Sequence, residues 1–328
     1  MIIAMLVRHY PPEKNVGGVA IATANLVKYY TKIYPKHIIH VVTASESGKK
    51  RLIVCENVVI HRINLRSKGL VMQGLEYLFK AFFCLKILHP DIIHVQGLGH
   101  SIPAYFCNKI YQIPYCVTAH GSDARGKKIS FSVKSALKIF VATPDLIKYV
   151  PSSTLLLNPI DLSEYPLVTK NINNESVIRI IHAPSSPKIK GTAYIVDVIN
   201  RLISQGYLID FRLIENMPHD HLIFEFRDAD IIIDQVLLGW YGMVSIEAMA
   251  LGKPVCTRID PELEMYIPEN TIMNCDKDTL FEKLAYLINN PDVRNKYAKN
   301  GRKYVEDNHD VAQICKRLCE TYTGIKDN

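Results

Sequence analysis

The chain has 328 residues and a mass of 37.2 kDa, with 48% hydrophobic and 22% charged residues, which excludes a peptide, a disulfide-rich miniprotein and a disordered chain. The net charge of +7 is unevenly distributed, because residues 1–158 carry 20 basic and 7 acidic side chains (+13), whereas residues 159–328 carry 19 and 25 (−6). A basic half attracts nucleic acid, an anionic lipid surface or a phosphorylated small molecule.

Short β-branched runs alternate with helix-like stretches along the chain, a pattern typical of parallel sheets covered by helices. In the first half we predict strands at 2–7, 38–43, 58–63, 92–95, 115–118, 139–142 and 154–157, and helices near 18–34, 70–88 and 101–111. In the second half we predict strands at 177–182, 211–214, 231–234, 254–257 and 271–273, and helices near 191–205, 219–227, 244–251, 277–289 and 292–307.

These elements predict an α/β protein of two doubly wound domains. The first covers residues 1–158 and the second residues 159–310, with a linker-like stretch rich in proline, asparagine and polar residues over 158–174. A last helix within 311–328 is long enough to pack back toward the first domain. In such folds ligands bind beyond the carboxyl ends of the strands, so we expect the active site in a cleft where the two domains face each other.

From the sequence we expect neither a secretory signal nor a membrane span. The longest apolar stretch, residues 77–88, is interrupted by Lys80 and Lys86. Eight cysteines are scattered without a CxxC pair. Free thiols in a reducing cytoplasm are the simplest interpretation, and we expect no metal site.

Two loops that follow predicted strands of the first half are candidate binding elements. Gly17 and Gly18 open a helix, where backbone N–H groups can approach a phosphate, although an ordinary turn explains the pair as well. The sequence lacks the GxGxxG and GxxxxGK[ST] patterns. His120, followed by Gly121, can present its imidazole to a substrate or cap a local turn.

The second half offers a cationic loop and an inward carboxylate. Lys188, Lys190 and Gly191 lie at a helix start, where two cations and the helix dipole suit a diphosphate, although a solvated basic loop is the alternative. Glu247 lies on a helix that follows a glycine-flanked turn, and its carboxylate can accept hydrogen bonds from both hydroxyls of a ribose.

Taken together, these segments resemble the retaining glycosyltransferases of family 4, which have the GT-B fold. The resemblance runs along most of the chain in order, through PPEKNVGGVA (11–20), DIIHVQG (91–97), TAHGSD (118–123), LNPID (157–161), KG (190–191) and EAMALGKPV (247–255). The last segment matches the most specific signature of the family.

The resemblance implies transfer of a sugar from a nucleotide diphosphate sugar with retained anomeric configuration and no required metal or cofactor. By the resemblance Glu247 holds the ribose, Lys190 binds the diphosphate and His120 lines the sugar site, so these three are the expected catalytic residues. The backbone at Gly18 and the N–H groups of Met243 and Val244, which follow Gly242 at a helix start, are expected to contact phosphate.

The chain departs from the family pattern at two places. Gly239 stands where the family has a second Glu, and Ser185 or Pro184 stands where it has an Arg. Lys188 is a candidate for the missing cation. Asp234 or Gln235, at the end of a strand, is a candidate for contact with the donor sugar.

The function that follows is a glycosyltransferase of polysaccharide or glycoconjugate biosynthesis, acting on a saccharide or lipid-linked acceptor. A nucleotide-sugar epimerase and a catalytically inactive binding subunit are the alternatives. The basic half is assigned to the acceptor side, which predicts an anionic membrane surface as a partner and a cytoplasmic protein that is peripheral at the inner face of the membrane. The helix near 70–88 then lies on an anionic surface or is a core helix with solvated lysines. Nucleic acid is disfavoured because no binding motif for it appears.

Overall fold

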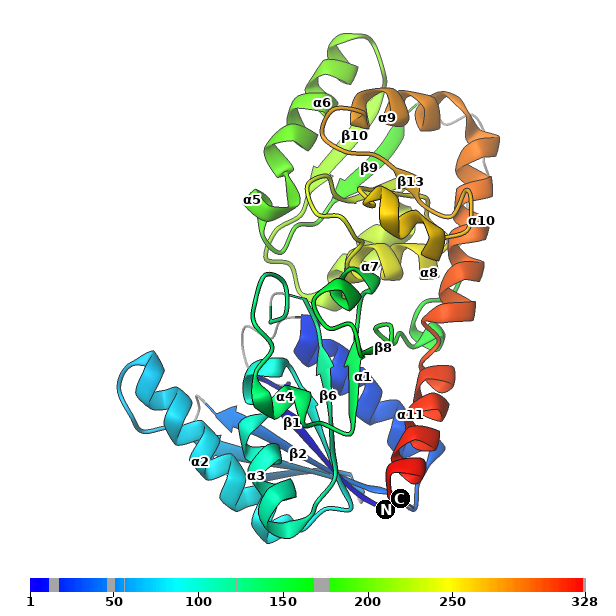
Figure 1. The fold of residues 1–328 in the computed structure, drawn as a ribbon. Coiled ribbons are helices and arrows are strands. Elements are labelled where there is room, and N and C mark those ends of the chain that lie inside the picture. Colours follow the sequence, from blue (N-terminus) through cyan, green and yellow to red (C-terminus); the bar gives the residue numbers. More distant parts are fainter. Residues whose placement is uncertain (12–17, 46–50, 56, 122, 168–176, 327–328) are drawn as a thin grey trace. The chain divides into compact units, whose positions relative to one another are not determined.

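The computed structural model describes residues 1–11, 18–45, 51–55, 57–121, 123–167 and 177–326. The chain forms two compact units, one made of Met1–Pro159 with Val311–Asn328 and the other of Ile160–Asp310. The expected boundary after residue 158 lies one residue before the boundary in the structure. Each unit is an α/β structure built on a sheet of parallel strands, so the predicted fold class of two doubly wound domains is confirmed (Figure 1).

The sheet of the first unit has eight strands in the order β3-β4-β2-β1-β5-β6-β7-β8. Its strands are β1 (Ile2–Val7), β2 (Ile38–Ser45), β3 (Arg51–Cys55), β4 (Val58–Asn64), β5 (Ile92–Gln96), β6 (Tyr115–Ala119), β7 (Lys138–Val141) and β8 (Thr154–Leu155). All neighbours pair in parallel except β3 with β4, which pair antiparallel. Sequence analysis missed β3, because its five residues form a short edge strand specified by pairing with β4.

Helices cover both faces of this sheet (Figure 1). On one face lie α1 (Gly18–Ile33) and α11 (Val311–Lys326), and on the other α2 (Leu70–Leu88), α3 (Ile102–Tyr111) and the short α4 (Phe131–Lys134). The apolar residues of β1 alternate between these two cores, since Ile3 and Met5 face α1 whereas Ala4 and Leu6 face α2.

The last helix, α11, packs against α1 within the first unit. Tyr322 of α11 is fully buried, and its hydroxyl lies 2.6 Å from Nδ1 of His94 on β5. Nε2 of His94 lies 2.7 Å from the hydroxyl of Thr118 on β6. This buried chain of hydrogen bonds fixes the end of the polypeptide to the centre of the first sheet.

The second unit has a five-stranded parallel sheet in the order β10-β9-β11-β12-β13. Its strands are β9 (Ile178–His182), β10 (Ile209–Leu213), β11 (Ile231–Gln235), β12 (Val255–Thr257) and β13 (Met273–Asn274). One face is covered by α6 (Thr192–Ser204) and α9 (Leu280–Asn289), and the other by α7 (His219–Asp228), α8 (Met243–Ala250) and α10 (Pro291–Asn308). The order of the strands reverses between β9 and β11, which is where doubly wound sheets bind ligands.

The contact between Tyr322 and His94 leads to a stability prediction. Burial lowers the pKa of His94 to about 3, so the ring is neutral and needs one donor and one acceptor. Tyr322→Phe removes the partner of Nδ1, and we expect it to lower the free energy of unfolding by about 1–2 kcal/mol, measured by urea denaturation followed by circular dichroism. Tyr286→Phe, a half-exposed tyrosine of α9, is the control, and an equal effect of both substitutions would contradict the prediction.

Candidate active site

The carboxyl ends of β9 and β11, on either side of the point where the strand order reverses, hold an ion pair. Nζ of Lys190, at the end of the short helix α5 (Pro187–Lys190), lies 2.5 Å from Oδ1 of Asp234 on β11. The Asp234 side chain is fully buried and the Lys190 side chain is 13% exposed. The pair therefore joins the loop after β9 to the end of β11, with only the lysine reaching the surface.

Asp234 also holds the start of α8. Its Oδ2 accepts hydrogen bonds from the backbone N–H of Gly242 and from the hydroxyl of Ser245, both at 2.7 Å. Burial acts to raise the pKa of Asp234, but the Lys190 ammonium and these hydrogen bonds outweigh it and hold the pKa below its usual range. Asp234 is thus a buried anion paired with Lys190, Gly242 and Ser245. Its role is to position Lys190 and the start of α8.

The ammonium of Lys190 consequently lies beside the first turn of α8. A Cβ on Gly242 would be 3.1 Å from Nζ of Lys190, so the glycine leaves room for the lysine. Met243 and Val244 are the first two residues of α8, and N–H groups at these positions have no acceptor within the helix. A cation and the positive end of a helix dipole are therefore concentrated in one place, which favours an anion.

The other residues expected in the cationic loop have different surroundings. Lys188 is exposed and lies two residues before Lys190 in α5, and residues with this spacing do not share a helix face. Gly191 has φ +81°, and a Cβ there would be 2.6 Å from Cγ2 of Val236. The glycine is thus required for close approach to the loop that follows β11.

Gln235 organises that loop. Its side-chain oxygen accepts from the N–H groups of Leu237 and Leu238, and its amide donates to the carbonyls of Leu238 and Arg258. The side chain is fully buried. These contacts place the Gln235 amide in the wall of the site rather than at its surface.

Gly239 has a structural reason to be a glycine. A Cβ at this position would be 1.9 Å from Oδ2 of Asp260, so the aspartate occupies the space of a side chain at 239. Asp260 is held there by its own N–H, which donates to the Gly239 carbonyl at 2.9 Å, and by Nη2 of Arg258 at 2.6 Å. Sequence analysis missed this Arg258–Asp260 pair, because no local pattern connects it to Gly239.

Glu247 has a partner that sequence analysis also missed. Nε2 of His219, at the start of α7, lies 2.9 Å from Oε1 of Glu247 on α8. The Glu247 side chain is 6% exposed and that of His219 is 40% exposed. The hydrogen bond to Glu247 raises the pKa of His219 above its ordinary value against the effect of burial, and Asp220 and Glu164 add to the rise.

In the first unit, His120 follows β6. Its Nε2 lies 2.8 Å from Oε1 of Gln96 on β5, and the N–H groups of His120 and Gly121 both donate to Oδ1 of Asp123. Burial lowers the pKa of His120 to about 4, opposed by Asp123 and by a hydrogen bond with Asn158. The ring is therefore a neutral imidazole at neutral pH, held at the carboxyl end of the sheet.

The glycine pair of the first unit is described only in part. Gly18 is the first residue of α1, after β1, and Gly17 lies outside the described residues. The strand order of the first sheet reverses between β1 and β5. The start of α1 therefore follows a strand beside the reversal, as expected for a phosphate-binding helix.

The close approach at Gly239 predicts that a larger side chain is not tolerated. Gly239→Ala forces Asp260 out of its pair with Arg258, and we expect a loss of about 1–3 kcal/mol in the free energy of unfolding. Gly99→Ala, with no atom within 4 Å of the new Cβ, is the matched control. The loss should shrink when Asp260→Ala is combined with Gly239→Ala, and full additivity would show that Asp260 is not the cause.

The His219–Glu247 pair predicts a pH-dependent contribution to stability. Because the pKa of His219 is raised in the folded state, its contribution is complete below the unfolded pKa of about 6.5 and is lost as pH rises through the folded pKa. We expect His219→Gln to cost about 0.5 kcal/mol on the acid side, allowing for solvent screening, and less on the alkaline side. Denaturation on the acid side and on the alkaline side of the His219 pKa measures the two costs. His221→Gln, on the same helix, is the control. A cost independent of pH would contradict the assignment.

Comparisons with known proteins point to glycosyltransferases. Residues 16–153 match the family described as Glycosyltransferase Family 4, and residues 241–320 match the one described as Glycosyl transferase-like. An uncharacterized glycosyltransferase of Methanocaldococcus jannaschii is 26% identical over 90% of this chain and 91% of its own length.

Solved structures share the fold along the whole chain. Sucrose-phosphate synthase from Thermosynechococcus elongatus has a TM-score of 0.78 at 15% identity and covers 99% of this chain and 98% of its own. Anabaena HepE, in complex with UDP and glucose, has a TM-score of 0.72 at 14% identity, with 99% and 100% covered. The solved structures show that the fold is that of GT-B glycosyltransferases, and the two family matches together with the relative along nine-tenths of the chain support a glycosyltransferase.

Proposed function

We propose that the chain transfers a sugar from a nucleotide diphosphate sugar to a saccharide or lipid-linked acceptor, with retention of anomeric configuration, in the synthesis of a polysaccharide or glycoconjugate. The observation that carries the proposal is the Lys190 ammonium, held by buried Asp234 beside the start of α8. HepE, which shares the fold, is described with UDP and glucose, which supports a nucleoside diphosphate as the leaving group.

In this proposal the Lys190 ammonium and the start of α8 assist the departure of the nucleoside diphosphate. As the bond between the sugar C1 and the phosphate oxygen breaks, negative charge develops on that oxygen. Lys190 and the N–H groups of Met243 and Val244 would stabilise this charge without reorganising, because Asp234 already fixes both elements. These groups supply the charge stabilisation that a metal ion would otherwise provide, so we propose that none is required.

The acceptor hydroxyl then attacks C1 on the face from which the diphosphate departs. The new bond joins C1 to the acceptor oxygen, and the hydroxyl proton passes to the departing phosphate oxygen. This sequence retains the anomeric configuration and needs no carboxylate nucleophile on the protein. Glu247 would hold the ribose hydroxyls with its carboxylate oriented by His219.

On the acceptor side we assign the first unit, with His120 lining the sugar site as a neutral hydrogen-bonding group. Residues 1–158 carry a net charge of +13, which supports an anionic acceptor such as one linked to a lipid phosphate. We place the reaction in the cytoplasm, where the seven cysteines that the structure shows outside any disulfide would remain reduced.

The proposal is tested by product analysis and by one substitution. Purified protein is incubated with a panel of nucleotide sugars and candidate acceptors, and the product anomer is assigned by NMR. We expect Lys190→Ala to lower kcat by about 100- to 1,000-fold, the cost of losing one charge-stabilising donor. Lys296→Ala, an exposed lysine of α10, is the control.

Each other outcome would exclude a specific part of the proposal. Near-normal turnover by Lys190→Ala would contradict the assignment of Lys190 to the diphosphate. A product with inverted anomeric configuration would contradict the retaining mechanism. An epimerised sugar formed without acceptor would indicate an epimerase. No hydrolysis or transfer with any donor would indicate a binding subunit.

A further inference from the structure

Helix α2 is apolar on two faces, and only one of them is covered. Tyr77, Ala81 and Leu85 are buried in the core of the first unit. A second row, spaced four residues apart, is exposed by 77, 56, 66, 41 and 81%: Val71, Leu75, Phe79, Phe83 and Ile87. Exposed apolar side chains gathered in such a row, here called the α2 stripe, indicate an interaction surface.

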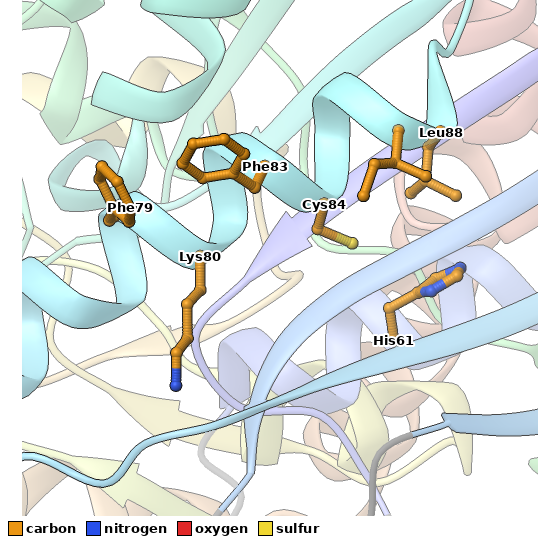
Figure 2. Close-up of a pocket in the computed structure, with 7 residues that line it drawn as sticks. His61, Phe79, Lys80, Phe83, Cys84 and Leu88 are labelled. Carbon is orange, nitrogen blue, oxygen red and sulfur yellow. The ribbon is translucent and has the colours of Figure 1, made fainter.

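The stripe borders an open groove between α2 and β4, shown in Figure 2. The groove has a volume of about 560 Å³. It is lined by Phe79, Phe83, Cys84, Ile87 and Leu88 of α2, with His61 of β4 and Lys80 at its side. Neighbouring α3, which packs against α2, also exposes Phe106 and Ile110 by 44 and 58%. The apolar surface therefore extends along α2 and includes a groove beside it.

Exposed lysines neighbour this surface in the chain, and its acidic side chain is paired with a lysine. Lys68, Lys86 and Lys109 are exposed around α2 and α3. Glu76 is the only acidic residue in the sequences of the two helices. Its carboxylate accepts from Nζ of Lys80 at 2.5 Å and from the N–H groups of Arg66 and Ser67. The hydrogen bond from Lys80 is the main reason that its pKa falls to about 2.

We propose that the α2 stripe docks the protein onto an anionic lipid bilayer, with the apolar side chains among the acyl chains and the lysines at the phosphate headgroups. Such a combination of an apolar row and flanking lysines is typical of helices that lie in the membrane interface. In the described part of the chain, no helix is long and apolar enough to cross a membrane. A second copy of the chain is a poorer occupant, because a symmetric contact would bring the same lysines face to face.

The docking test is independent of sugar chemistry. The full chain is sedimented with vesicles of phosphatidylcholine alone or with phosphatidylglycerol, at low and high salt. We expect binding to the anionic vesicles, weakened by salt. The triple variant Phe79→Glu, Phe83→Glu, Ile87→Glu should lower partitioning by about tenfold or more, since it removes apolar insertion and adds repulsion.

Two further variants separate the contributions. Lys68→Gln, Lys86→Gln, Lys109→Gln should reduce the preference for anionic vesicles while leaving the apolar row intact. The matched control is Phe224→Glu, Met265→Glu, Tyr286→Glu, three residues of the second unit exposed by 63, 83 and 50%, which should bind like the unmodified chain. Thermal unfolding and donor hydrolysis, measured on all variants, show whether the fold and the donor site are unchanged.

The contrary results are specific. Absence of binding to anionic vesicles at low salt, or undiminished binding by the stripe variant, would overturn the proposal. A dimer in sedimentation velocity that the stripe variant abolishes, without vesicle binding, would assign the surface to a second copy. Because partitioning is read without a nucleotide sugar, its failure leaves the proposed transfer reaction standing, and failure of transfer leaves docking standing.

Discussion

The second unit depends on one buried carboxylate. Asp234 lies at the end of β11, fully removed from water, and such an anion is stable only if its charge is compensated. Lys190, the N–H of Gly242 and the hydroxyl of Ser245 provide this compensation. The same contacts fix the loop after β9, the end of β11 and the start of α8 relative to one another. Of the groups that compensate Asp234, Lys190 is also the one assigned to an anionic ligand, and Gly242 and Ser245 hold the start of α8 beside it.

Net charge does not indicate where the groups suited to an anion lie in this protein. The half of the chain with a net charge of −6 contains the ammonium and the helix start best arranged for a phosphate, since local fields depend on a few fixed groups. The strongly basic half has its own surface, where lysines surround an exposed apolar helix. The two halves therefore carry different electrostatic features, and the total of +7 describes neither.

One of the two departures from the family pattern, Gly239, has a physical explanation. Gly239 lacks a side chain because Asp260 occupies that space, held by Arg258. The glycine at 239 and the Arg258–Asp260 pair therefore occupy one space together. Gln235 and Asp234 are built into the wall of the site, and so they act through Leu237, Gly242 and Lys190 rather than at the surface.

The sequence by itself determined most strands and helices, the two-unit organisation and the location of Lys190, Glu247 and His120 next to strand or helix ends, because these features depend on local periodicity and on glycine and proline. It did not reveal β3, the partnership of His219 with Glu247, or the pair formed by Arg258 and Asp260. These depend on contacts between residues far apart in the chain. Only the tertiary structure decided which side chains neutralise one another and which face of α2 stays uncovered, since burial and pairing arise when separate elements pack together.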